Sequence, residues 1–159
     1  MIHLRTKLIA QKPDEKKLRK ITILTEQIIA SFDSQDITPL IEEIIHLSEL
    51  DSLDEDYFRH LHSHSSIEEF AAMAALPRAE KVSDLKYEEL IEITRRAMKV
   101  QSWDAEYYME LLDKNVPMPE ASSLIFHPPE NYDGDIGNYC PTPEEIVNWA
   151  TSRNQTIQL

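Results

Sequence analysis

The segment Ser122–Asn131, which reads S-S-L-I-F-H-P-P-E-N, decides how the second half of the chain is organised. Its central L-I-F-H run is long enough for only about one helical turn, and a helix that short is not stable on its own in water. Two prolines beginning at Pro128 end the turn, because proline lacks the backbone donor and disfavours helix at the residue before it. We therefore expect Phe126 and His127 to sit on a short, stiff apolar turn between longer helices, where an anchor for a partner would be placed.

The composition indicates a folded protein built almost entirely from helices. The 159 residues are 42% hydrophobic and 28% charged, which is enough apolar material for a buried core. Only two glycines are present, which argues against β-meanders and phosphate-binding loops, and the nine prolines are expected to begin and end helices. We predict an all-α fold, and no sequence pattern calls for a cofactor.

The charge of the chain restricts the class of partner. A net charge of −13, from 16 basic and 29 acidic residues, disfavours nucleic acid and anionic membranes as direct partners. It favours a basic protein partner, although a need for solubility explains an acidic chain equally well. The single cysteine, Cys140, excludes an internal disulfide framework and fits a reducing compartment. With no signal-peptide pattern and no apolar run of membrane length, we expect a cytoplasmic protein.

The first half of the chain is predicted to contain four short helices. Met1–Pro13 precedes them and alternates apolar and polar residues like a strand. A single strand has no partner in a helical protein, so we interpret this segment as a flexible or edge-seeking arm. Apolar residues then recur at helical spacing over Lys16–Phe32. Three further helices are predicted from N-terminal capping signals, which are Thr38 with Pro39, Ser52 with Glu55, and Ser66 with Glu69.

Leu76–Val82 is the best candidate for a boundary, because it is polar, contains a proline and lies between two capping signals. A linker between two units and an ordinary loop both fit this segment. We take it to separate an N-terminal helical region, residues 1–79, from a second region, residues 80–159. In the second region, helices are predicted to begin at three capping signals, which are Ser83, Ser102, and Thr142 with Pro143 and Glu145.

Four motifs follow one another in the second region. They are S-D at Ser83, E-E-L-I-E-I at Glu88–Ile93, L-I-F-H-P at Leu124–Pro128 and T-P-E-E-I-V at Thr142–Val147. On these motifs, residues 83–154 resemble the immunity proteins of the DNase colicins and S-type pyocins, which are small, acidic, four-helix proteins. The resemblance covers roughly half of the chain and implies a distorted four-helix bundle over residues 80–159.

In that family, the inhibitor sits beside the active site of a cytotoxic nuclease and blocks the substrate by bulk and negative charge. The resemblance therefore implies a bacteriocin-type immunity protein that binds a cognate basic nuclease domain and is not itself an enzyme. It assigns the anchoring contacts to Phe126, His127 and Pro128, although the family has tyrosines at the first two positions. It assigns partner selectivity to five residues of the preceding helix, Ala105, Glu106, Met109, Glu110 and Asp113. Met1–Lys81 has no counterpart in the family.

The same residues also fit interpretations without a toxin partner. Phe126 fits a core position beside Leu124, and the acidic side chains of the preceding helix fit an ordinary solvated face. In a second hypothesis, the chain is an acidic helical adaptor or regulatory module whose working surface is Met1–Pro77. The order of the motifs and the Phe-His pair before two prolines favour the inhibitor.

No catalytic constellation is present in the sequence. His60, His62 and His64 form H-L-H-S-H, but residues two apart on a helix point in different directions and do not converge on one metal ion. A metal-dependent hydrolase using these histidines is therefore the weakest alternative. Glu88 and Glu89 are predicted on the outside of a helix, where nothing would raise a carboxyl pKa for acid catalysis. We expect neither a bound metal nor an enzymatic activity.

Overall fold

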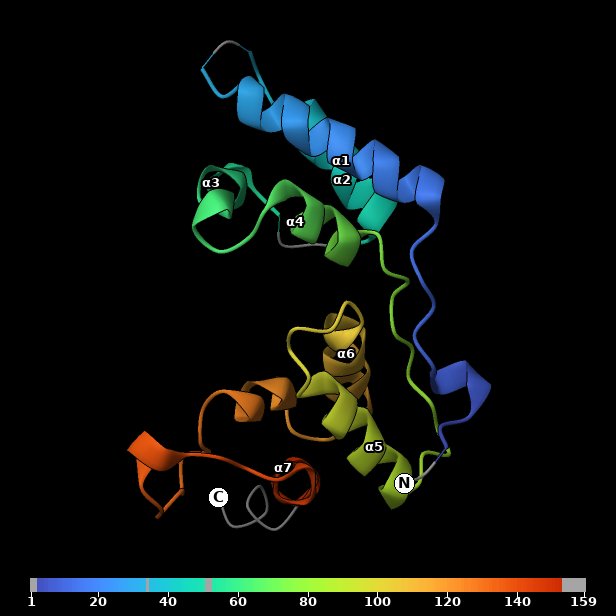
Figure 1. Ribbon diagram of the computed structural model, residues 1–159, viewed down its shortest axis with the longest axis vertical. Coiled ribbons are helices and arrows are strands. Elements are labelled where there is room, and N and C mark those ends of the chain that lie inside the picture. The colour runs from blue at the N-terminus through green and yellow to red at the C-terminus, as the bar shows by residue number, and fades with distance from the viewer. Residues whose placement is uncertain (1–2, 34, 51–52, 153–159) are drawn as a thin grey trace. The chain divides into compact units, whose positions relative to one another are not determined.

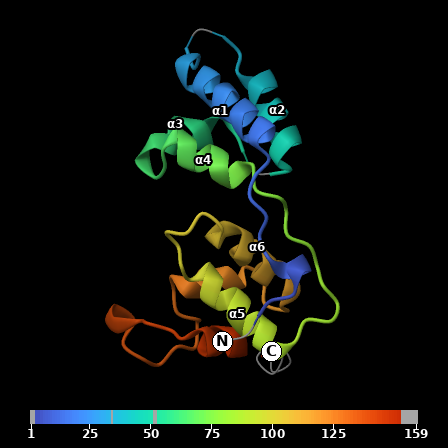
Figure 2. The same cartoon turned by 45° about the vertical axis from the view of Figure 1, so that its right-hand side comes forward.

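The computed structural model describes residues 3–33, 35–50 and 53–152, and this part of the chain is all-α (Figures 1 and 2). It contains no β-strand within those ranges, so the predicted fold class is confirmed. None of the described helices is both long and apolar enough to cross a membrane. The α-helices are α1 (Glu15–Ala30), α2 (Thr38–Ser48), α3 (Glu55–Arg59), α4 (Ile67–Ala74), α5 (Tyr87–Ala97), α6 (Ala105–Asn115) and α7 (Pro143–Thr151). Short 3₁₀ helices are η1 (Thr6–Leu8), η2 (Leu61–Ser63), η3 (Ala121–Ile125) and η4 (Ile136–Asn138).

The chain divides into two compact units. One consists of Gln11–Arg78 and is called the 11–78 unit below. The other joins Met1–Ala10 to Ala79–Leu159 and is called the 79–159 unit. The division after Arg78 lies next to the predicted boundary between residues 79 and 80. The predicted N-terminal region is corrected at its beginning, because residues 3–10 pack with the second half of the chain.

Helix α1 organises the 11–78 unit, where it packs against α2, α3 and α4. The core includes Ile21 and Ile28 of α1, Ile44 of α2, and two aromatic rings, Phe58 and Phe70. These rings lie edge to face with centroids 5.4 Å apart, an arrangement that the charge distribution of aromatic rings favours. Helices this short are marginal in isolation, so burial of their apolar faces against one another stabilises them.

Two of the predicted helix starts have the full reciprocal capping arrangement. At α4, the Glu69 amide donates to Ser66 Oγ at 3.0 Å, and the Ser66 amide donates to Glu69 Oε1 at 3.1 Å. At α7, the same two bonds join Thr142 and Glu145 at 3.1 and 2.9 Å. Each box satisfies amides that the first helical turn leaves without intrahelical partners, which is why these starts are predictable from sequence.

Other helix starts lie a few residues from their predicted positions. Thr38 is the first residue of α2 rather than its cap, and its amide donates to Asp36 Oδ1 at 3.0 Å. Helix α3 is capped by the side chain of Asp54, while the predicted cap Ser52 lies outside the described residues. Ser83 does not cap α5, which begins at Tyr87.

The 79–159 unit contains α5, α6, η3 and α7, in the order of the four predicted elements. Helix α5 packs against α6 and α7, and η3 packs against α6 and α7. Fully buried side chains from three helices fill this unit, including Ile93, Tyr108, Leu111, Leu112, Ile146 and Val147. Trp103 is exposed and precedes α6.

The N-terminal segment is an integral part of the 79–159 unit, so its prediction as a flexible or strand-seeking arm is wrong. Leu4, Leu8 and Ala10 are buried, and residues 6–8 form the 3₁₀ helix η1. The Ala10 amide donates to the hydroxyl of Tyr108 at 3.0 Å, which ties the segment to α6. The alternating pattern that resembled a strand thus places its apolar residues on a helical surface instead of on a sheet.

Arg5 joins this segment to α5 through two carboxylates. Its guanidinium donates to Asp84 Oδ2 at 2.8 Å and to both oxygens of Glu89 at 2.7 and 2.8 Å. Glu89 was predicted on the exterior of the helix, but it is buried beneath this contact. The hydrogen bond from Arg5 lowers the pKa of Asp84 to about 2 and lowers the pKa of Glu89 as well. Both carboxylates are therefore ionised structural partners rather than candidate acid catalysts.

Candidate protein-binding site

The predicted anchor turn is the 3₁₀ helix η3, and its start is shaped by two acidic residues. Glu120, immediately before η3, adopts a left-handed conformation with φ of 53°, which turns the chain sharply into the helix. Asp113 of α6 then accepts hydrogen bonds from both the amide and the hydroxyl of Ser122, each at 2.7 Å. A carboxylate that satisfies two donors at the start of the turn fixes its direction relative to α6.

Contacts from α7 and from the loop before it hold the rest of the turn. Ala121 and Leu124 are buried, so one side of η3 faces the core of the unit. The hydroxyl of Tyr139 donates to the Leu124 carbonyl at 2.5 Å, and η3 packs against α7. Just before η3, the Met118 amide donates to the Ala150 carbonyl of α7 at 3.2 Å. A turn too short to be stable alone is thus held by three neighbouring segments.

Phe126 projects from the end of this turn into solvent. Its residue surface is 53% exposed, whereas the adjacent Leu124 is buried. The alternative in which Phe126 fills the core is therefore wrong, although it was right for Leu124. The amides of Phe126 and His127 both donate to the Ser123 carbonyl, at 3.0 and 2.9 Å, so the backbone of the exposed pair is ordered. His127 is exposed and Pro128 is half-buried. The exposed Phe-His pair is thus followed at once by a residue that packs against the rest of the unit.

The five residues predicted for partner selectivity on α6 have different environments. Ala105 is only 1% exposed, so its side chain is not available to a partner and its assignment is corrected. Glu106 is exposed and Met109 is half-buried. Glu110 is half-buried and accepts a hydrogen bond from the Ala79 amide at 2.5 Å. Asp113 is likewise committed within the fold through Ser122, which leaves Glu106 as the fully presented carboxylate of the set.

The polypeptide around the turn is strongly acidic. Residues 115–152 contain no lysine or arginine, and they contain six carboxylates, Glu120, Glu130, Asp133, Asp135, Glu144 and Glu145. Glu120 and Glu130, which flank η3 and its two prolines, are both exposed. The exposed ring of Phe126 is therefore bordered in the chain by negative charge, an arrangement that complements a basic surface with an apolar pocket.

An aromatic cluster that was not predicted from the sequence supports the turn from the loop side. The Tyr139 ring lies stacked on Trp149 of α7 with centroids 6.4 Å apart, and it meets Tyr132 edge to face at 5.2 Å. Burial raises the pKa of Tyr139, so its hydroxyl stays protonated and donates to Leu124 over the physiological pH range. Gly134 makes room for this cluster, because a Cβ there would lie 2.5 Å from the Tyr132 hydroxyl. The glycine was the sequence signal for this packing.

The remaining candidate chemistry is dispersed. His60, His62 and His64 are all exposed around η2, and the His64 ring packs against Tyr57 with centroids 5.6 Å apart. Within the described ranges, no group of three or more histidine, cysteine or acidic side chains is placed to hold a metal ion. Cys140 is exposed.

Comparison with known proteins adds no family to this description. No protein-family model, no curated protein and no solved structure matches the chain. The functional interpretation therefore rests on the geometry of η3, on the charge around it and on the resemblance of the four motifs. Among the described residues, these features amount to an exposed aromatic ring on a braced turn, with exposed carboxylates on both sides of it in the chain.

Proposed function

We propose that this protein is an immunity-type inhibitor that binds a cognate basic cytotoxic nuclease and blocks access of its substrate, without catalysis. The observation that carries the proposal is the 53% exposure of Phe126 at the end of a turn braced from α6, α7 and the loop that contains Tyr139. A large aromatic side chain held in water on an ordered backbone is the form of a binding anchor. The motif order around it supports the assignment to the immunity type.

Bracing of the turn affects the affinity directly. An anchor that is already ordered loses little conformational entropy on binding, so more of its burial energy contributes to the complex. Truncating a buried aromatic anchor at an interface typically costs about 2 kcal/mol or more, which is roughly a 30-fold rise in Kd. Phe126 has no hydroxyl, so its contribution is apolar burial, and His127 supplies the polar contact beside it.

The acidic surface has a separate role in this mechanism. A nuclease surface that binds DNA or RNA phosphates carries lysine and arginine, and exposed carboxylates such as Glu106, Glu120 and Glu130 attract it. Charge complementarity of this kind raises association rates toward about 10⁸ M⁻¹s⁻¹ at low salt. Once bound, the same negative charge repels nucleic acid, so bulk and charge both exclude the substrate.

The test is an inhibition assay with the full-length chain and the basic nuclease domains encoded beside its gene. Phe126→Ala should raise the inhibitory concentration at least about 30-fold while leaving the melting temperature almost unchanged. Ile23→Ala is the matched control, because Ile23 has similar exposure, 49%, but lies on α1 in the 11–78 unit. Full nuclease activity in the presence of excess wild-type protein, for each candidate nuclease, would reject the proposal. If Phe126→Ala weakened binding and lowered the melting temperature together, Phe126 would have a structural role and would not be an anchor.

A second candidate function is an acidic adaptor that works through the 11–78 unit. The observation that favours it is the exposure of Ile23 and Ile29 on α1, at 49% and 38%. Ile23 also lines a groove on α1 with Leu18 and Thr22, and exposed apolar surface with a polar rim is a feature of protein-binding sites. The two variants separate the hypotheses, because an adaptor would lose its partner with Ile23→Ala and keep it with Phe126→Ala.

A further inference from the structure

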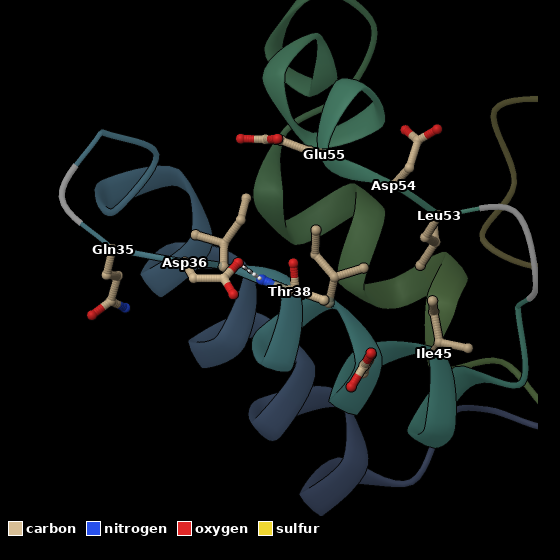
Figure 3. Close-up of a pocket in the computed structure, with 10 residues that line it drawn as sticks. Gln35, Asp36, Thr38, Ile45, Leu53, Asp54 and Glu55 are labelled. Carbon is tan, nitrogen blue, oxygen red and sulfur yellow. Dashed lines mark hydrogen bonds between the residues drawn. The ribbon is translucent and has the colours of Figure 1, made fainter.

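A cavity of about 330 Å³ opens in the 11–78 unit, between the N-terminal part of α2 and the segment that leads into α3 (Figure 3). Its apolar lining is formed by Ile37, Ile41, Ile45 and Leu53. These side chains belong to the core of the unit or pack directly against it. The floor is therefore fixed by core packing, and a concave apolar surface with polar groups at its edge is the usual form of a binding site.

The rim of the cavity is acidic. The described residues that line it include no lysine, arginine or histidine. They include four carboxylates, Asp36, Glu42, Asp54 and Glu55. In Figure 3, Asp36 lies on the α2 side of the opening, and Asp54 and Glu55 lie on the α3 side. An apolar floor whose charged lining residues are all acidic complements a ligand that combines a cation with an apolar body.

The four rim carboxylates differ in how far the fold already occupies them. Asp36 accepts the Thr38 amide at 3.0 Å, and Asp54 caps α3. Glu55 forms an exposed ion pair with Arg59 at 2.9 Å. The carboxylate of Glu42, which is exposed on α2, has neither a hydrogen bond nor an ion pair with another residue in the described part of the chain. It is therefore the rim group that a ligand would meet without displacing an internal contact.

The arrangement selects among cationic ligands. A metal ion is a poor fit, because the described residues bring no three carboxylates together around one point. The volume is near the lower end of the roughly 300–1,000 Å³ range of drug-sized sites, which suits one or two side chains better than a whole cofactor. Arginine and lysine have an apolar stem and a charged head, and so they match both the floor and the rim.

We propose that this cavity binds a basic peptide segment of a partner protein. An arginine or lysine side chain lies with its stem along the isoleucines of α2 and its charged head beside Glu42. A neighbouring apolar side chain of the segment fills the remaining space against Leu53. The site is independent of the inhibitor proposal, because all of its residues lie in the 11–78 unit and Phe126 lies in the other unit.

Methyl NMR of the full-length chain tests the proposal with a defined probe. Acetyl-Leu-Arg-Leu-Arg-amide should shift the methyl resonances of Ile37, Ile41, Ile45 and Leu53, and added salt should weaken this effect because the rim charges are exposed. The matched peptide with citrulline in place of arginine keeps the shape and loses the charge. Equal binding of the citrulline peptide, or equal binding of spermine at the same methyls, would overturn the proposal of a basic peptide. The absence of any shift at these methyls would overturn it as well.

Variants on the rim give an independent test. Glu42→Gln should weaken binding of the arginine peptide about two- to fivefold, the range expected for an exposed ion pair, and Glu42→Lys should abolish it. Glu26→Gln is the matched control, because Glu26 is an exposed glutamate of α1 that does not line the cavity. The methyl spectrum without peptide shows whether each variant is folded. A loss with Glu26→Gln as large as with Glu42→Gln would show general charge attraction instead of a site.

Discussion

Replacing Leu8 by alanine tests whether the N-terminal segment belongs to the 79–159 unit. Leu8 is 0% exposed at the end of η1. The substitution removes roughly three methylene equivalents, worth about 2.4 kcal/mol of transfer free energy, and the cavity left behind raises the expected loss of stability to about 3–5 kcal/mol. The adjacent Ile9 is 37% exposed, so Ile9→Ala is the matched control and should cost less than about 1 kcal/mol.

Native-state hydrogen exchange is the appropriate assay, because it reports the stability of each unit separately. The Leu8→Ala chain should show accelerated exchange at the protected amides of α5, α6 and α7. The protected amides of α1 and α4 serve as an internal reference from the 11–78 unit. Equal effects of Leu8→Ala and Ile9→Ala would refute the reasoning, because burial would then not be what holds the segment. A loss confined to α1 and α4 would show that the segment belongs to the other unit.

Three further predictions address the charge contact, the turn and the acidic face. The hydrogen bond from Arg5 lowers the pKa of Asp84 from 3.8 to about 2, so the stability that ionised Asp84 contributes is fully present above pH 3.8 and is lost as the pH falls toward 2. The stability of the Asp84→Asn variant should therefore depend less on pH over that interval, and an unchanged dependence in acid unfolding would contradict this. Tyr139→Phe removes the donor to the Leu124 carbonyl, so the local free energy of opening at the end of η3 should fall by about 1 kcal/mol, and the amides there should exchange faster. Unchanged exchange there would mean that the hydroxyl does not brace the turn. Glu106→Lys should slow association with the nuclease several-fold at low salt and little at high salt in stopped-flow measurements, and equal slowing at both salt concentrations would point to a lost contact rather than to steering.

Local capping chemistry determined which helix starts were predictable. The boxes at Ser66 and Thr142 each combine a cap with a glutamate three residues later, and both partners act within one turn of the backbone. Ser83 has the residue type of a cap, but the Lys86 amide donates to Glu89 Oε1 at 3.0 Å and α5 begins at Tyr87. A single capping residue is a weaker signal than a reciprocal pair, because a serine competes with other nearby side chains for the same role.

The N-terminal segment illustrates what sequence patterns leave undetermined. Its alternation of Leu4 and Leu8 with polar residues indicates burial, and burial is what the structure shows. The partner is supplied by residues about eighty positions away, since Arg5 reaches Asp84 and Glu89. No local rule identifies such a contact, because periodicity specifies which face is apolar and not what covers it. The same contact explains why Glu89 is buried despite its place in a run of acidic residues.

The anchor turn was predictable in position because its two prolines and its short apolar run are local signals. Its bracing was not, because Asp113 and Tyr139 reach it from α6 and from a later loop. This difference changes how the acidic face of α6 should be interpreted. Carboxylates three and four residues apart share a face, but Glu110 and Asp113 accept hydrogen bonds from Ala79 and Ser122, and only Glu106 is left fully exposed. Acidic residues that share one helix face in the sequence can therefore have different roles. Those that already accept a hydrogen bond from a backbone amide stabilise the fold, and those that accept none remain available to a partner.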